Sequence, residues 1–342
     1  NYAILLASRS KGITGKNPPV GCVIVKKDIL LSTGSTSTSG RPHAEENAIN
    51  NIKDKKQLSG ATMYVTLEPC AHKNLNGMSC AELISNSGIS EVFISCIDPD
   101  PRTLKKGIKI LKKNNIRVHI NFMNENCSDL YEGFYSRILK NRPFVTLKIA
   151  CSLDGKIALN NNQSKWITND LSRNYVHLIR SQNDAIMTTS STIILDNPEM
   201  NCRLKGLEKH SPIRIVFDKN LNSKINKYIF KTANKKNTLV IYNKALKSKI
   251  KSLKKNTTLI KSKINKNMVL DIKLILKKLY KLGLRNVLVE GGNELTQGFL
   301  KKRLFNQFYL FKSPKRLSTK SDYIKFNGLK LLSERYKSKI KL

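Results

Sequence analysis

Apolar and polar residues in the first 140 positions form short strand-like runs that alternate with helix-like segments. Runs rich in β-branched residues predict strands at 20–25, 62–67, 91–96 and 116–120. Helical spacing predicts helices at 43–53, 79–87 and 105–114. A last amphipathic helix carries Leu130, Phe134 and Ile138 on one stripe and ends near Pro143. This alternation indicates a layered α/β fold.

A second set of strands begins directly after that helix. Apolar runs predict strands at 144–150, 213–217, 238–242 and 286–290. The stretch from Lys219 to Lys273 is rich in lysine and shows no sharp pattern. We therefore place a domain boundary at about residue 143 and predict two α/β domains, 1–143 and 144–342.

The chain is strongly basic, because 62 Lys and Arg against 24 Asp and Glu give a formal net charge of +38. One interpretation is binding to nucleic acid. The lysines, however, are spread from Lys11 to Lys341 without an arginine–aromatic platform, which favours a compositional origin. We therefore do not expect nucleic acid as a partner. The positive field would instead attract anionic, phosphorylated substrates.

Signals for membranes, secretion and disulfides are missing from the sequence. No apolar run approaches the length needed to cross a bilayer. The apolar residues 2–7 are too short for a secretory signal and follow no basic region. The seven cysteines are scattered and odd in number, which does not suggest a disulfide framework. We expect a soluble, cytoplasmic protein without a membrane partner.

His43, Glu45, Cys70 and Cys80 form a motif whose residue types suit a catalytic zinc ion. Such a site takes three protein ligands and leaves a fourth position for water. The imidazole and two thiolates are suitable ligands, so Glu45 is free to carry protons. Zinc lowers the pKa of its water, hydroxide can attack an amidine-like ring carbon, and Glu45 can protonate the departing amine. The order matches the H-x-E…P-C pattern of zinc base deaminases, but nine residues rather than two separate the cysteines.

The wide cysteine spacing and the segments NPPVGCVIV, GRPHAEENAI and GATMYVTLEPCAH resemble the bifunctional deaminase/reductases of riboflavin biosynthesis. This resemblance implies a cytidine-deaminase-like α/β/α domain that removes the 2-amino group of 2,5-diamino-6-(5-phosphoribosylamino)pyrimidin-4(3H)-one. Asn17 resembles the family's base-contacting asparagine, and His72 is a candidate contact for the substrate phosphate. The loop AHKNLNGMS lacks the family's Gly-x-Thr-Pro-Pro run and is one residue longer, which leaves its substrate contacts open.

The second half contains VEGGNEL, a strand followed by Gly291, Gly292 and a helix start. Glycines allow a ligand to approach the backbone, and the amides of a helix N-terminus bind phosphate. The blocks LKIACSLDGKIA, SKWIT, LIRSQNDAIMTTSSTIILDNPEMNCR and PIRIVFD resemble the reductase half of the same family. The resemblance implies a dihydrofolate-reductase-like α/β domain. It also implies NADPH-dependent reduction of the ribosyl group of 5-amino-6-(5-phosphoribosylamino)uracil to ribityl, and a homodimer formed through this domain.

The family's positions, carried onto this sequence, define a substrate set and a cofactor set. Arginines suit the substrate phosphate because a guanidinium donates paired hydrogen bonds. The substrate set is Ser164, Arg180, Met200, Arg203 and Glu290. The NADPH set is Ala150, Trp166, Thr192, Asp196 and the loop Gly292, Asn293, Glu294, Leu295, Thr296, Gln297 and Gly298. Asp196 is expected nearest the ribose carbon that receives hydride, and Asn197 stands where the family often has a second aspartate.

Two other functions stay open at this stage. The charge is compatible with a nucleic-acid-acting zinc deaminase that carries a basic C-terminal binding module. The Asn197 change and the poorly matched tail are compatible with a deaminase attached to a degenerate reductase domain. The sequence favours the two-step enzyme over both.

Overall fold

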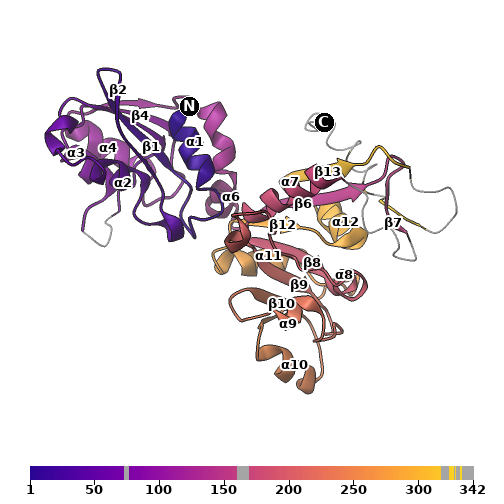
Figure 1. The fold of residues 1–342 in the computed structure, drawn as a ribbon. Coiled ribbons are helices and arrows are strands. Elements are labelled where there is room, and N and C mark those ends of the chain that lie inside the picture. Colours follow the sequence, from indigo (N-terminus) through magenta and orange to yellow (C-terminus); the bar gives the residue numbers. More distant parts are fainter. Residues whose placement is uncertain (73–76, 160–168, 317–322, 327, 329–331, 333–342) are drawn as a thin grey trace. The chain divides into compact units, whose positions relative to one another are not determined.

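The computed structural model describes residues 1–72, 77–159, 169–316, 323–326, 328 and 332. The chain divides into two compact units, Asn1–Asn141 and Arg142–Leu342 (Figure 1). None of the helices in these described ranges is long and apolar enough to span a membrane.

The first unit is a mixed sheet with helices on both faces. Its strands are β1 (Gly21–Lys26), β2 (Ile29–Ser35), β3 (Thr62–Leu67), β4 (Glu91–Cys96) and β5 (Arg117–Ile120). Its helices are α1 (Tyr2–Arg9), α2 (Ala44–Asn50), α3 (Cys80–Ser85), α4 (Lys106–Lys113), α5 (Asn124–Cys127) and α6 (Glu132–Lys140). The strand order is β2-β1-β3-β4-β5. β1 runs antiparallel to both neighbours, whereas β3, β4 and β5 are parallel.

Two glycines set how closely α1 and α2 pack on this sheet. A Cβ on Gly21 would lie 1.9 Å from the carbonyl oxygen of Ala3, and one on Gly34 would lie 2.1 Å from that of Ala44. Gly34 pairs with the residue next to Gly21, so the two glycines face opposite sides of the sheet. Helices α1 and α2 therefore cover opposite faces, and α2 sits directly on β2.

The second unit is built on a parallel sheet. Its strands are β6 (Phe144–Cys151), β7 (Lys156–Leu159), β8 (Ala185–Thr189), β9 (Ile213–Phe217), β10 (Thr238–Tyr242), β11 (Thr258–Lys261), β12 (Asn286–Val289), β13 (Gln307–Lys312) and β14 (Tyr323–Lys325). Its helices are α7 (Asp170–Ser181), α8 (Ser190–Asp196), α9 (Tyr228–Lys231), α10 (Lys247–Lys254), α11 (Ile272–Lys281) and α12 (Gly292–Lys302). The main sheet has the order β11-β10-β9-β8-β12-β6-β13, and all its pairings are parallel. β7 and β14 form a separate antiparallel pair.

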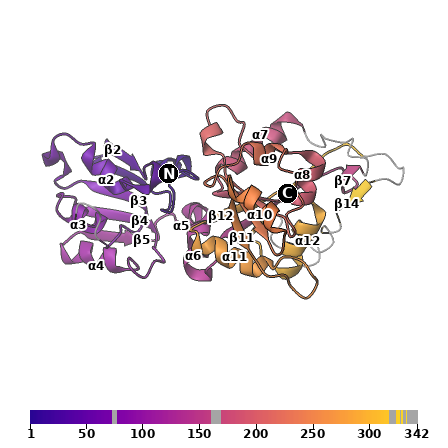
Figure 2. The same ribbon diagram turned by 90° about the horizontal axis from the view of Figure 1, so that it is seen from below.

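Helices cover both faces of the parallel sheet, as expected for strands that read as near-continuous apolar runs. One apolar core lies between the sheet and α11 and α12, with Ile275, Leu279 and Phe299 fully buried. The other core contains Ile193 of α8 and Ile229 of α9. Figure 2 shows α7, α8 and α9 on one side of this sheet and α11 and α12 on the other.

The predicted α/β class is confirmed, and each predicted strand is present to within one residue at either end. The predicted helices are also present, although α2 ends at Asn50 and α3 at Ser85, before the predicted ends. The elements that were not predicted are α1, β2, α5, β7, α7, β8, α8, α9, α10, β11, α11, β13 and β14. Several of them are short, but β8 is a buried central strand of the main sheet, so tertiary packing rather than a local pattern decides its structure.

Candidate active sites

The three predicted metal ligands meet at one point in the first unit. His43 is the N-cap residue of α2, Cys70 lies in the loop after β3, and Cys80 begins α3. The Nδ1 atom of His43 lies 3.3 Å from Sγ of Cys80 and 3.6 Å from Sγ of Cys70, and all three donor atoms lie within 4.8 Å of one another. A tetrahedral zinc ion would separate N and S ligands by about 3.5 Å. The donor set therefore fits zinc in type and in spacing.

The thiol of Cys70 has the electrostatics of a metal ligand. Hydrogen bonds from Cys80 and from His43 lower the pKa of Cys70 to about 4, against the opposing effect of burial. The backbone N–H of Cys80 also donates to Sγ of Cys70, over 3.4 Å. A thiolate is the form that binds metal, so Cys70 is prepared for a cation.

Glu45 and Asn17 lie beside this triad, as predicted. Glu45 is only 3% exposed, and burial raises the pKa of its carboxyl to about 7. A carboxyl with a pKa near neutrality can both accept and release a proton. The Nδ2 atom of Asn17 lies 3.4 Å from Nε2 of His43 and donates to the carbonyl oxygen of Gly40 over 2.8 Å. Gly40 has φ of +100°, and a Cβ there would meet the Asn17 amide at 2.8 Å.

A buried carboxylate, Glu68, holds the loops around the metal ligands and was not predicted. It is 2% exposed and accepts backbone N–H groups of Lys105 at 3.1 Å, Asp98 at 3.4 Å and Ile108 at 3.5 Å. These bonds tie the segment before Cys70 to the loop after β4. The Glu-Pro-Cys sequence signals its position, but its partners lie 30 or more residues away and only the fold brings them together.

In the second unit, Arg180 and Glu290 form a buried ion pair. Nε and Nη2 of Arg180 donate to the two carboxylate oxygens of Glu290 over 2.8 and 3.0 Å, in the paired geometry of a guanidinium and a carboxylate. Nζ of Lys148 lies 3.5 Å from the same carboxylate. Burial alone would raise the pKa of Glu290, but the charges of Arg180 and Lys148 outweigh that effect and lower it to about 2. Lys148 was not predicted, and its signal was a charged residue within the apolar run of β6.

The segment that follows α8 joins this cluster. The carbonyl oxygen of Asn201 accepts a hydrogen bond from Nη1 of Arg180 over 3.0 Å, and its side chain contacts Nη1 of Arg203 at 3.0 Å. Met200 is buried. Arg203 also pairs with Glu199 at 3.3 Å and is about half exposed, so it can reach a ligand. The predicted substrate residues Arg180, Met200, Arg203 and Glu290 thus lie close together, while Ser164 lies outside the described residues.

Several predicted cofactor residues lie at the carboxyl ends of neighbouring parallel strands. Ala150 is near the end of β6, Thr192 follows β8, and Gly292 follows β12. The order β8-β12-β6 makes these strands adjacent, and ligands of parallel sheets bind at such ends. A Cβ on Gly291 would meet Leu295 at 2.7 Å and Thr188 at 3.3 Å, and Gly292 has φ of +40°. The paired glycines therefore allow a close turn into α12. Trp166 lies outside the described residues.

The segment expected as a cofactor loop, Gly292 to Gly298, is the first part of helix α12. Leu295 and Thr296 are buried in the core, and a Cβ on Gly298 would lie 3.0 Å from Ile272 of α11. The accessible residues of this segment lie on the opposite side of the helix, which is the side that a ligand can reach; they are Gly292, Asn293, Glu294 and Gln297.

Asp196 and Asn197 end helix α8. Asp196 is exposed and stands one helical turn after Thr192. Asn197 has φ of +45°, a left-handed conformation that asparagine tolerates, and its Oδ1 accepts the N–H of Tyr228 over 2.8 Å. Asn197 therefore has a structural role as the helix terminus, and its presence in place of aspartate gives no sign of a degenerate site.

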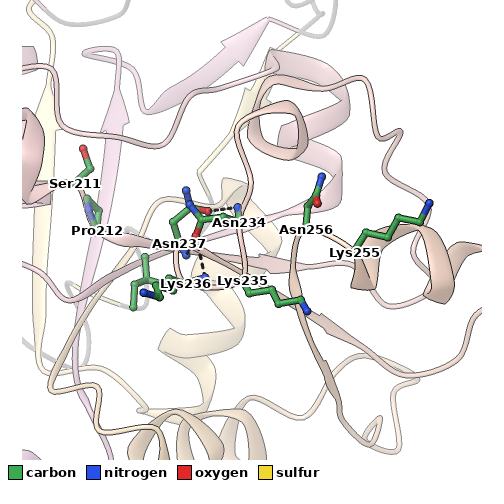
Figure 3. Close-up of a pocket in the computed structure, with 9 residues that line it drawn as sticks. Ser211, Pro212, Asn234, Lys235, Lys236, Asn237, Lys255 and Asn256 are labelled. Atoms are coloured by element: carbon green, nitrogen blue, oxygen red, sulfur yellow. Dashed lines mark hydrogen bonds between the residues drawn. The ribbon is translucent and has the colours of Figure 1, made fainter.

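A hollow of about 630 Å³ lies at the amino ends of β9 and β10, away from these residues (Figure 3). Asn234 and Asn237 close a turn there, because each accepts the backbone N–H of the other over 2.8 to 2.9 Å. The hollow is lined by Ser211, Pro212, Ile213, Asn234, Lys235, Lys236, Asn237, Lys255 and Asn256. Its side chains include none of the predicted catalytic groups.

The fold and the two sites define an enzyme in which a zinc-binding deaminase domain is joined to a reductase domain. The family described as "Cytidine and deoxycytidylate deaminase zinc-binding region" matches residues 1–96, and that described as "RibD C-terminal domain" matches residues 143–331. The chain is 36% identical to the riboflavin biosynthesis protein RibD of Aquifex aeolicus over 313 residues, which cover 92% of this chain and 85% of that protein.

Two solved structures have the same architecture over almost the whole chain. Acinetobacter baumannii RibD, form 1, is 32% identical with a TM-score of 0.84, covering 95% of this chain and 88% of that one. A Thermotoga maritima protein titled as a diaminohydroxyphosphoribosylaminopyrimidine deaminase/5-amino-6-(5-phosphoribosylamino)uracil reductase is 33% identical with a TM-score of 0.81, covering 96% and 88%. The chain belongs to the RibD family of bifunctional deaminase/reductases of riboflavin biosynthesis.

Proposed function

We propose that the first unit deaminates 2,5-diamino-6-(5-phosphoribosylamino)pyrimidin-4(3H)-one and that the second unit reduces the resulting 5-amino-6-(5-phosphoribosylamino)uracil with NADPH. The observation that carries this proposal is the convergence of His43, Cys70 and Cys80 beside buried Glu45, in a chain whose other unit matches the RibD C-terminal domain. The two reactions act on the same phosphorylated pyrimidine in sequence. Their order follows from the family to which the chain belongs.

In the deaminase site, His43, Cys70 and Cys80 would hold Zn²⁺. The metal would supply a water of lowered pKa as the nucleophile. Glu45 would take the proton of that water and deliver it to the exocyclic nitrogen, so that the amine leaves as ammonia. Its burial suits this role, because a pKa of about 7 lets the carboxyl hold the proton between the two transfers. Asn17 would orient the ring through its side-chain amide.

In the reductase site, Arg180, Arg203, Met200 and Glu290, with Ser164 from outside the described residues, would bind the phosphoribosyl group. Arg180 is already paired with Glu290 in a buried site, whereas the guanidinium of Arg203 is about half exposed and its ion pair with Glu199 is looser, at 3.3 Å, so Arg203 is the better phosphate ligand. NADPH would supply the hydride. The turn at Gly292, with Thr192 and Ala150, would place the cofactor at the carboxyl ends of the strands, and Asp196 would face the reacting ribose.

Substitution of the proton carrier tests the deaminase assignment. Glu45→Gln should reduce ammonia release by at least about 100-fold, because general acid–base catalysis contributes that much or more. Zinc content should stay at one ion per chain, since Glu45 is not a ligand. Glu46→Gln is the matched control, because Glu46 is the next residue of α2 and has no assigned role. Loss of zinc together with activity would show that Glu45 is a ligand, and retained activity would refute the proton-carrier role.

A further inference from the structure

Arg41, His72 and Arg102 are basic side chains on the loops around the candidate zinc site, and none of them has a role in the deamination described above. Arg41 lies two residues before the ligand His43, in an extended loop segment. Arg102 lies in the loop after β4, next to Thr103, whose hydroxyl oxygen is 3.4 Å from Nδ1 of His72. His72 in turn follows Cys70, and its carbonyl oxygen is 3.9 Å from Sγ of that cysteine. These loops form the rim of the metal site.

The positive charges of Arg41 and Arg102 both act on His72. Burial is the main cause that lowers the pKa of His72, and the charges of Arg102 and Arg41 lower it further. The charge of Arg41 also acts on His43, and that of Arg102 on Cys70. Both guanidinium groups therefore lie within electrostatic reach of the metal ligands, from two separate loops.

Arg41 is half-buried and forms no hydrogen bond or ion pair with any residue in the part of the chain that the structure describes. Half-buried arginine normally has a partner, because desolvating a charge without compensation is unfavourable. A guanidinium with all its donors available beside a metal site is suited to an anion, and its planar fork fits a phosphate.

Arg102 is held in place by a neighbouring carboxylate. Its Nε and Nη2 atoms donate to Asp100 at 3.0 and 2.7 Å, and the backbone N–H of Arg102 donates to the same carboxylate at 2.9 Å. Asp100 is itself buried and fixed by a hydrogen bond from its backbone N–H to Asp98 over 2.8 Å. The side chain of Arg102 is 68% exposed, and its Nη1 atom has no partner among the described residues. Asp100 thus orients Arg102 and leaves one edge of the guanidinium open to solvent.

We propose that Arg41 and Arg102 bind the phosphate of the deaminase substrate and make this half of the enzyme selective for the phosphorylated pyrimidine. This inference rests on the deaminase function proposed above. A phosphate dianion on the rim would provide Arg41 with the partner it lacks and would bridge the two loops. The ring would then extend from the rim towards Glu45 and the metal. Neither arginine touches a reacting atom, so both act on binding and positioning.

The test compares wild type, Arg41→Gln, Arg102→Gln and the control Arg117→Gln in the full-length, zinc-loaded enzyme. Arg117 is an exposed arginine of β5 that also pairs with one carboxylate, at 3.5 Å from Glu91. Ammonia release is measured with the phosphorylated pyrimidine and with its dephosphorylated riboside at physiological salt. Each active-site variant should raise KM for the phosphorylated substrate about 10-fold, with kcat within about twofold, and should leave kcat/KM for the riboside unchanged. Arg117→Gln should match wild type with both substrates.

A second readout does not depend on turnover. Titration calorimetry gives the number of inorganic phosphate ions bound per chain. Wild type and Arg117→Gln should each bind one more phosphate than Arg41→Gln or Arg102→Gln. Arg102→Lys should recover part of the affinity for phosphate. Arg102→Gln leaves the Asp100 carboxylate without its partner, and Asp100→Asn/Arg102→Gln removes that charge as well. The double variant should lose phosphate binding to the same extent as Arg102→Gln. Equal losses on phosphorylated and dephosphorylated substrates, or unchanged phosphate stoichiometry in all variants, would overturn the inference. If zinc-loaded wild type released no ammonia while the arginine-dependent phosphate site was present, the deaminase proposal would fail and the anion site would stand.

Discussion

The ion pair between Arg180 and Glu290 leads to a quantitative prediction for the stability of the second unit. The pKa of Glu290 falls from 4.5 to about 2, because the charges of Arg180 and Lys148 outweigh the effect of burial. Each pH unit corresponds to about 1.4 kcal/mol, so the charged carboxylate stabilises this unit by about 3 kcal/mol at pH 7. Glu290→Gln keeps the shape but removes the charge, and should therefore lower the free energy of unfolding by about 3 kcal/mol.

Calorimetry and urea denaturation of the full chain measure this loss. For a unit of this size, about 3 kcal/mol corresponds to a fall of about 6 to 12 °C in Tm. A carboxyl whose folded pKa is depressed stabilises above its unfolded pKa, and the effect disappears as pH falls. The gap between wild type and variant should thus be full at pH 7, begin to shrink near pH 4.5 and reach about half by pH 3.

A double-mutant cycle separates the ion pair from other effects of the substitution. Because Arg180 and Glu290 share two hydrogen bonds, Arg180→Gln/Glu290→Gln should cost at least about 1 kcal/mol less than the sum of the single variants. The ion pair would not be the source of this stability if Glu290→Gln lost less than about 1 kcal/mol, if the single variants were additive, or if the gap did not narrow at low pH.

Three further outcomes follow from the packing and the metal site. Gly34→Ala should lower both thermal stability and zinc content, because its Cβ would lie 2.1 Å from the carbonyl oxygen of Ala44 on α2. Gly60→Ala is the control, because nothing lies within 4 Å of its Cβ. It should lose only about 1 kcal/mol of stability, from its positive φ, and should retain zinc. Asn197→Ala should destabilise the second unit by about 1 to 2 kcal/mol in denaturation, whereas Asn197→Gly, which adopts the left-handed conformation freely, should lose less. Chelation of zinc should abolish ammonia release but leave reduction of the uracil intermediate intact; loss of both activities would contradict two independent sites.

The convergence of His43, Cys70 and Cys80 could be predicted from the sequence because these residues lie in short motifs. His43 caps the start of α2, and Glu45 follows two positions later in its first turn. Cys70 lies in the loop before α3, and Cys80 is the first residue of α3. The residues that support the metal ligands were harder to predict from the sequence. Glu68 contacts backbone groups 30 to 40 positions away, and no local pattern reveals such partners.

The reductase site shows the limit of sequence reasoning more clearly. Arg180 and Glu290 are separated by 110 positions and Lys148 and Glu290 by 142, so their pairing depends on strand order in the parallel sheet. The family pattern placed Arg180 and Glu290 in one substrate set, but it gave no sign that the two side chains form an ion pair with each other. Helix α11 was missed for a different reason: its buried residues Ile272, Ile275, Leu276 and Leu279 have helical spacing, but the surrounding lysines obscured that pattern.

The claim that one chain carries both reactions is tested most directly by following ammonia and absorbance at 340 nm together. Zinc-loaded enzyme is supplied with the diaminopyrimidine substrate, with and without NADPH. We expect ammonia release in both reactions and, with NADPH present, a fall in absorbance that reaches one NADPH for each ammonia. Ammonia release without any NADPH consumption would show that the chain is not bifunctional, because an active deaminase would then be attached to a unit that does not reduce the product.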